Sequence, residues 1–303
     1  MAAVRKLLEA LACLFFVLFA SFLMARSVPG GPFDQEKAIP PHIKKFMEVK
    51  YGFNRSPIQH FFSYFNGLFH GDLGVSLKFT NRPVIDIIAQ SLPSSLTLGV
   101  SALALALLLG FPLGILSAWR RGTWLDTASV FLCVSGVTLP TFLLGALCVL
   151  CFTHWLGWLP PARLDSAEHY IMPVMTLAFR PCAIIAQMTR ASLIGELKSD
   201  YVRTARAKGV SEARIILLHA LRNTLVPTIS VLGPVVANIL TGSFIVEHFF
   251  AIPGVAKYFI EAVTNRDVFL IMGVTLVFAV IMIATSLIVD LMYPRLDPRM
   301  KNG

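Results

Sequence analysis

The sequence predicts an all-α polytopic membrane protein with six transmembrane helices. Of its 303 residues, 56% are hydrophobic and 14% are charged, whereas a typical soluble domain has about 25% charged residues. There are too few polar residues to cover the surface of a soluble domain. Intrinsic disorder is also excluded, because disordered chains have low hydrophobicity and high charge. The apolar residues also form long runs, unlike the alternating ~10-residue segments of a membrane β-barrel.

A transmembrane helix needs about 20 mostly apolar residues, and six stretches meet this requirement. They are residues 7–25, 92–118, 128–155, 170–189, 223–246 and 268–289. The first could instead be a signal peptide, but its long apolar region, without a clean small-residue cleavage site after it, favours a retained helix. We expect three regions: residues 1–91 with the first span and a long outer loop, a five-helix core at 92–292, and a tail at 293–303.

The basic residues predict that both termini lie in the cytoplasm. Lys and Arg concentrate near the N-terminus, at Arg120 and Arg121, in the loop 190–222 and in the C-terminal tail. Short cytoplasmic loops of membrane proteins carry an excess of these residues, so these segments are placed inside. The formal net charge of +9 then reflects orientation in the membrane, and we expect no nucleic-acid partner.

The long outer loop is expected to contain two short helices, at residues 42–51 and 58–69, followed by a turn at 71–76. The spacing of Ile43, Phe46, Met47 and Lys50 suits an amphipathic helix, and the second segment is rich in aromatic residues. We expect this loop to pack as a cap on the spans, and a contact surface for an external partner is the alternative.

No sequence motif for catalysis, a cofactor or a metal is present. The sequence lacks the phosphate-binding pattern GxxxxGK[ST], the metalloprotease pattern HExxH and the nucleophile pattern GxSxG. The five cysteines lie in apolar stretches and are expected to act as small buried side chains. We therefore expect a chain that is not an enzyme by itself, binds no cofactor or metal, and takes energy for any uphill transport from an ion gradient or a partner.

Arg180 is the one conspicuous charge inside a predicted span. Such a charge is costly in a membrane and usually faces a polar cavity or a partner. Arg180 therefore either lines a pathway for an anionic group or snorkels and pairs with a neighbouring subunit. Small residues and prolines predict close packing or kinks within the spans, and these are Gly110, Pro112, Gly114, Pro140, Pro181, Pro227 and Pro234.

The loop 190–222 is expected to form a rigid helix–glycine–helix elbow. Asp200 is a candidate N-cap, and the residues from Tyr201 to Lys208 favour a helix that ends in cations. Gly209 suits a left-handed terminator, and Ser211 suits the cap of the next helix. A solvated basic loop is the alternative, but this combination favours a docking element. Its candidate residues are Asp200, Tyr201, Arg203, Thr204, Ala205, Arg206, Ala207, Lys208, Gly209 and Ser211.

At this elbow the chain resembles the permease subunits of ABC importers that use an external binding protein. Their general pattern is E-A-A-x-x-x-G, and here Arg203-Thr204-Ala205 stands in place of E-A-A. That departure matches the peptide-type branch, in which R-T-A-R-A-K-G is usual. Collinear matches at residues 29–33, 71–74, 252–254 and 297–299 extend the resemblance over nearly the whole chain. The chain looks like the first permease subunit of an oligopeptide importer.

The resemblance implies a type I permease fold in a bacterial inner membrane, with this chain forming half of a translocation pathway. Its implied partners are a second permease subunit, two ATPase subunits that bind ATP and Mg, an external peptide-binding protein, the peptide substrate and membrane lipid. The elbow would dock in a cleft of one ATPase. Permeases for dipeptides, nickel or antimicrobial peptides look similar, and a secondary carrier driven by an ion gradient is the alternative of another class.

Overall fold

The computed structural model describes residues 2–27, 40–79, 82–161 and 166–296. This part of the chain is helical without strands, apart from an isolated antiparallel β-bridge between Val75 and Pro83. The sequence motifs at residues 29–33 and 297–299 lie outside the described residues.

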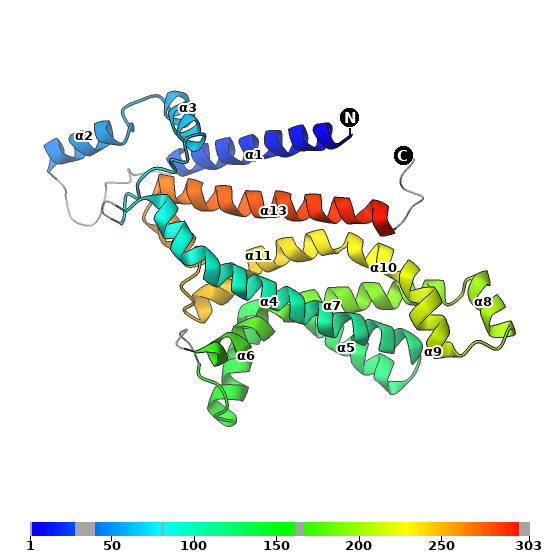
Figure 1. Ribbon diagram of the computed structural model, residues 1–303. Helices are drawn as coiled ribbons and strands as arrows, with labels where there is room; N and C mark the ends of the chain where they lie inside the picture. Colours follow the sequence, from blue (N-terminus) through cyan, green and yellow to red (C-terminus); the bar gives the residue numbers. More distant parts are fainter. Residues whose placement is uncertain (1, 28–39, 80–81, 162–165, 297–303) are drawn as a thin grey trace. The chain divides into compact units, whose positions relative to one another are not determined.

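Thirteen α-helices and three short π- or 3₁₀-helices follow one another in the described residues (Figure 1). The first part of the chain holds α1 (Ala2–Ser27), α2 (Pro41–Lys50), α3 (Pro57–Leu68), α4 (Val84–Trp119), α5 (Trp124–Thr138), α6 (Thr141–Cys148), η1 (Val149–Trp155) and η2 (Ala167–Tyr170). The rest holds α7 (Ile171–Glu196), α8 (Asp200–Ala207), α9 (Glu212–Arg214), η3 (Ile215–Ala220), α10 (Leu221–Ser230), α11 (Leu232–Phe249), α12 (Val255–Thr264) and α13 (Val268–Leu296).

Four described helical segments are long and apolar enough to cross a membrane, which agrees in part with the six predicted spans. They are Leu8–Ser27, Val84–Trp119, Ala167–Glu196 and Val268–Val289. The third predicted span, residues 128–155, is not one continuous helix, because α5 and the helix that follows it meet at 113°. Leu139, the residue before Pro140, is extended with ψ 130°, as expected for a residue that precedes proline.

The fifth predicted span, residues 223–246, is also divided. Val231 separates α10 from α11, and neither helix is among the four long apolar segments. Pro227 lies inside α10, whereas Pro234 is the third residue of α11, a place where proline is tolerated because the first turn has no partner for its missing N–H. The described residues therefore contain four candidate spans, or five if the bent pair formed by α5 and the helix after it is counted as one span. The presence of six spans stays a prediction.

The chain divides into two compact units, and the first comprises residues 1–95 and 253–283. Its core contains the fully buried side chains of Phe22, Phe61 and Ile87. Asp267, just before α13, is fully buried and accepts hydrogen bonds from the Ser76 hydroxyl at 2.5 Å and from the Leu77 amide at 2.9 Å. This carboxylate therefore fixes the segment at residues 76–78 to the start of α13.

The second unit comprises residues 96–252 and 284–303. In it, α7 packs against α5, α6, α10 and α11. The small residues Gly110 and Gly114 lie where α4 touches α7: a Cβ atom added at these positions would come within 2.9 Å of the Cys182 carbonyl oxygen and 2.5 Å of the Ala186 carbonyl oxygen. Only residues without a side chain permit so close an approach of two helix backbones. Pro112 lies between them within α4, and Pro181 lies inside α7.

Candidate functional site

The elbow, residues 196–214, joins α7 to η3 in the second unit. Its helix α8 begins after Ser199, whose φ of −68° and ψ of 156° are those of an N-cap residue. The prediction that Asp200 is the N-cap is therefore wrong by one residue, because the Asp200 backbone is already helical. Its carboxylate instead lies in the first turn, where negative charge complements the helix dipole.

A Schellman motif built around Gly209 ends α8. The Gly209 amide donates to the Arg206 carbonyl oxygen at 2.9 Å, and the Val210 amide donates to the Ala205 carbonyl oxygen at 3.1 Å. Gly209 has φ 77°, in the left-handed region. A Cβ atom at Gly209 would meet no atom within 4 Å, so the need for glycine comes from backbone conformation alone.

Buried apolar side chains attach the elbow to the rest of the second unit. Val202 is fully buried in α8, as is Ile215 directly after α9. Ile216 is also buried, in a cluster with Leu193 of α7 and Ala220. Since α8 packs on η3 as well, a displacement of α8 is resisted by contacts with its neighbours.

Hydrogen bonds at the Tyr201 hydroxyl connect α8 to α7 and to α10. The Tyr201 hydroxyl donates to Glu196 Oε2 at 2.5 Å and accepts from Asn223 Nδ2 at 3.2 Å. Burial, followed by the hydrogen bond to the Glu196 carboxylate, raises the pKa of Tyr201 above its ordinary value. The phenol therefore stays protonated and keeps its bond to the end of α7.

An ion pair bridges the turn at Gly209. Arg206 Nε lies 2.6 Å from Glu212 Oε1, and a second guanidinium nitrogen donates to Glu212 Oε2 at 3.1 Å. The Arg206 guanidinium lowers the pKa of the Glu212 carboxyl below its ordinary value. Both side chains are exposed, so the pair adds little stability, but its two-point geometry restricts the angle between α8 and α9.

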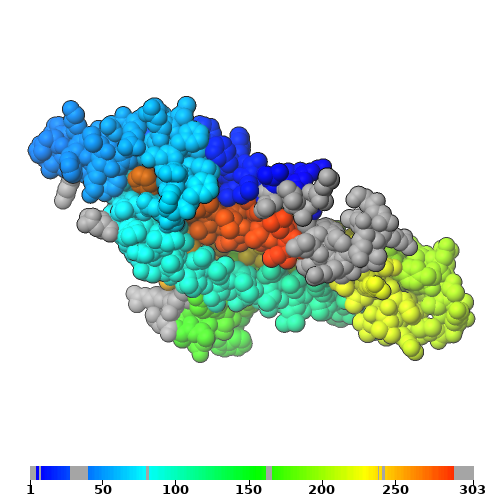
Figure 2. Space-filling model, turned by 45° about the horizontal axis from the view of Figure 1, so that its top comes forward, coloured from blue at the N-terminus to red at the C-terminus, as the bar shows by residue number. Residues whose placement is uncertain are grey.

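The other face of α8 is polar and open to solvent. The side chains of Asp200 and Arg203 are 95% and 72% exposed, and this surface lies in the yellow-green part of Figure 2. Ala205 is half-buried, and the remaining exposed candidate residues are Thr204, Ala207, Lys208, Gly209 and Ser211. The elbow is thus a short, well-braced helix with one buried side and one accessible side.

A partly buried ion pair near the elbow, between α5 and α7, was not expected from the sequence. Arg190 Nε donates to Asp126 Oδ1 at 2.8 Å, and a second Arg190 nitrogen donates to Asp126 Oδ2 at 3.0 Å. The Ser117 hydroxyl and the Gly122 amide donate to the same carboxylate at 2.6 and 3.0 Å. This Asp126–Arg190 pair therefore joins the end of α4, the start of α5 and the last turns of α7.

Arg180 lies on α7 with an exposed side chain. Among the described residues, no carboxylate lies within ion-pair distance of its guanidinium. The described residues also contain no group of three or more His, Cys, Asp or Glu side chains that could hold a metal ion.

Comparison with known proteins identifies the family. A family model described as "Binding-protein-dependent transport system inner membrane component" matches residues 110–302, which is more than half of the chain. The chain belongs to this family. The match includes the elbow, the Asp126–Arg190 pair and every described helix from α5 to α13.

Similar proteins cover nearly the whole chain of this inner membrane component. The dipeptide transport system permease protein of Bacillus subtilis is 41% identical over 281 residues, which are 93% of this chain and 91% of that protein. The oligopeptide transport system permease proteins of Haemophilus influenzae and Escherichia coli are 38% and 37% identical over 299 residues, with 98% of each chain covered. Together with its apolar helices, this makes the chain a multi-pass inner membrane protein with the architecture of a permease.

Proposed function

We propose that this chain is one permease subunit of an ATP-driven oligopeptide importer and forms half of the translocation pathway. The family match and the names of the oligopeptide permeases that align over 98% of the chain support this proposal. A second permease subunit would complete the pathway, and an external binding protein would deliver the peptide. Both termini of the chain would lie in the cytoplasm.

The elbow would transmit force from an ATPase subunit to the spans. The observation that carries this proposal is the combination of an exposed polar face on α8 with a terminator and a buried base that hold α8 rigid. A flexible loop would absorb a push from a partner, whereas a braced helix passes it on to α7 and η3. ATP and Mg would be bound by two ATPase subunits, and this chain would supply no catalytic group.

Site-specific cross-linking tests the coupling proposal. In the assembled transporter, a cysteine at the exposed position Thr204→Cys is expected to cross-link to an ATPase subunit, with a yield that changes when ATP is bound. Trp158→Cys is the matched control, because its side chain is 68% exposed but it lies in the loop after η1. If the cysteine at position 204 forms no cross-link to an ATPase subunit, with or without ATP, the proposal is overturned.

A dipeptide importer is the second candidate, and the 41% identity to the Bacillus subtilis dipeptide permease favours it. Uptake of labelled peptides of two to six residues by the reconstituted complex, with each length competing against the others, separates the two cargoes. Nickel or antimicrobial-peptide uptake would assign another cargo within the family. Ion-driven uptake by the purified chain alone would instead identify a secondary carrier and reject the proposed ATP-driven mechanism.

Arg180 is proposed to line the pathway, because its side chain is exposed on α7 without a described carboxylate partner. A cysteine introduced by Arg180→Cys is expected to react with a small charged thiol reagent from one side of the membrane, at a rate that changes with nucleotide. Ile185→Cys on the same helix is the control for a fully buried position. Protection of position 180 in every nucleotide state would indicate packing against a neighbouring subunit instead.

A further inference from the structure

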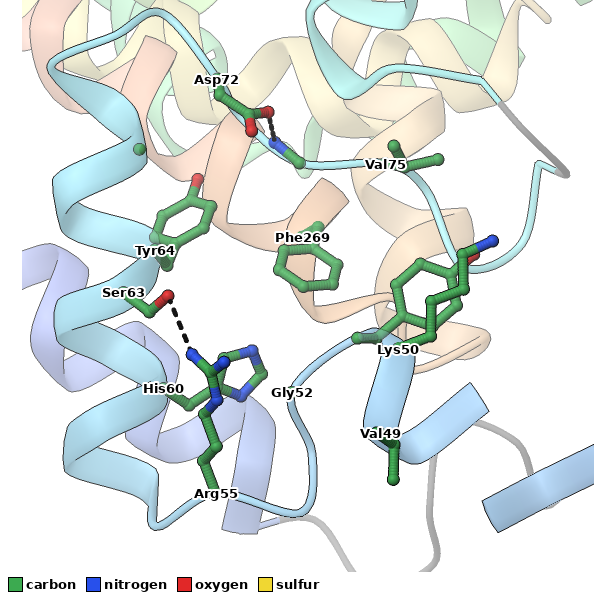
Figure 3. Close-up of a pocket in the computed structure, with 13 residues that line it drawn as sticks. Val49, Lys50, Gly52, Arg55, His60, Ser63, Tyr64, Asp72, Val75 and Phe269 are labelled. Carbon is green, nitrogen blue, oxygen red and sulfur yellow. Dashed lines mark hydrogen bonds between the residues drawn. The ribbon is translucent and has the colours of Figure 1, made fainter. Parts of the chain in front are cut away.

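A polar pocket lies within the first unit, away from the elbow in sequence. The end of α2, the turn between α2 and α3, one side of α3, the loop at residues 72–75 and the first residues of α13 line an open pocket of about 410 Å³ (Figure 3). Pockets for small molecules typically measure about 300–1,000 Å³. Gly74, with φ 78°, lets the backbone run against the ring of Phe269, because a Cβ atom there would lie 2.8 Å from that ring.

One end of the pocket carries an uncompensated positive charge. Among the described residues, Arg55 has no carboxylate partner, and its guanidinium makes one long hydrogen bond of 3.4 Å, to the Ser63 hydroxyl. The neighbouring His60 accepts from Arg26 through Nδ1 at 2.7 Å, because a guanidinium has no acceptor. Burial first, and then the charges of Arg26 and Arg55, lower the pKa of His60 to about 4, so His60 is neutral. Lys50, at the end of α2, is a second cation that lines the pocket.

The other end carries a negative charge and an unsatisfied hydroxyl. Asp72 Oδ1 accepts from the Gly74 amide at 2.8 Å, and no described cation pairs with this carboxylate. The Tyr64 side chain is 6% exposed, and its hydroxyl has no hydrogen-bond partner among the described residues. Figure 3 shows this hydroxyl directed toward the end where Asp72 lies, with Arg55 at the opposite end and the Phe269 ring between them.

We infer that this pocket binds a small zwitterion, with its oxyanion at Arg55 and its ammonium group at Asp72. A simple anion would be repelled by Asp72, and a simple cation would be repelled by Arg55, whereas a zwitterion satisfies both ends at once. The aromatic ring of Phe269 lines the space between the two charges. The inference rests on the first unit alone and does not depend on coupling to an ATPase.

Two sources could supply this chemistry: a free amino acid or short peptide, and the headgroup of a phosphatidylethanolamine lipid. The full chain in phosphatidylglycerol nanodiscs is incubated with labelled glycylglycine, with N-acetyl-glycylglycine, which lacks the ammonium, and with glycylglycine amide, which lacks the carboxylate. A second arm measures retention of phosphatidylethanolamine by native mass spectrometry. Binding of glycylglycine at least about tenfold tighter than either singly charged analogue, or selective retention of the ethanolamine lipid, supports the inference and identifies the source.

Variants assign the binding to this pocket. Arg55→Gln and Asp72→Asn are each expected to weaken binding about tenfold, because each removes one charge-assisted contact. Arg121→Gln and Asp86→Asn are matched controls at exposed positions outside the pocket. The inference is overturned if no zwitterion binds, or if the pocket variants bind as well as the controls.

Discussion

Replacement of Gly209 by valine is expected to reduce ATP-driven peptide uptake at least tenfold while the chain still inserts in the membrane. A β-branched residue at φ 77° costs roughly 1–2 kcal/mol or more, because its Cβ atom crowds the backbone in the left-handed region. Relief of that strain requires loss of the two Schellman hydrogen bonds, and α8 then loses its fixed end. Uptake and ATP hydrolysis are measured together in the reconstituted transporter, where we expect hydrolysis to persist with little transport.

Two variants separate the loss of the elbow geometry from backbone strain in general. Gly157 has φ 64° and, like Gly209, no atom within 4 Å of an added Cβ atom. Gly157→Val therefore introduces a similar strain outside the elbow, and uptake should be largely retained. Gly209→Asn should also retain most uptake, because asparagine tolerates the left-handed conformation better than other side chains. Normal uptake by Gly209→Val, or an equal loss in Gly157→Val, would contradict the role proposed for the elbow.

Local signals in the sequence predicted the helix–glycine–helix form of the elbow and the two short helices that follow the first span. The helix expected at residues 42–51 corresponds to α2 (Pro41–Lys50), and the one expected at 58–69 corresponds to α3 (Pro57–Leu68). The left-handed glycine at position 209 was predicted in the same way. In each case the information lies within a few neighbouring residues, in a proline, a cap or a glycine.

Contacts between distant residues could not be predicted from such patterns. Ser76 and Asp267 are hydrogen-bonded although 191 residues separate them in the chain, and 64 residues separate Asp126 from Arg190. In the sequence, Arg190 looked like one of many cytoplasmic basic residues, and Asp126 lay just before a predicted span. The size of the bend at Pro140 could not be predicted from hydropathy either, because a straight span and a span bent by 113° have the same apolar composition.

Removal of one partner of the Asp126–Arg190 pair is the second change expected to have a large effect. The Asp126 side chain is 9% exposed and that of Arg190 is 29% exposed, so Asp126→Asn leaves a poorly solvated guanidinium without its counter-ion. Breaking a buried ion pair costs about 3–5 kcal/mol, and the partial exposure of Arg190 reduces this to about 2 kcal/mol. The melting temperature of the purified chain in detergent should fall by roughly 4–8 °C.

The double variant Asp126→Leu with Arg190→Met distinguishes the penalty of an unpaired charge from a need for the pair itself. Apolar replacement of both partners is often nearly neutral for stability, but the buried Ser117 hydroxyl and the Gly122 amide also lose their acceptor. The melting temperature should therefore recover only part of the loss. Uptake should not recover with it, because the two-point contact also orients the last turns of α7, which lead through Glu196 into α8. A stable double variant with normal uptake would show that the pair contributes only to folding. A stable variant with impaired uptake would show that force from the elbow needs a fixed end of α7 to reach the spans.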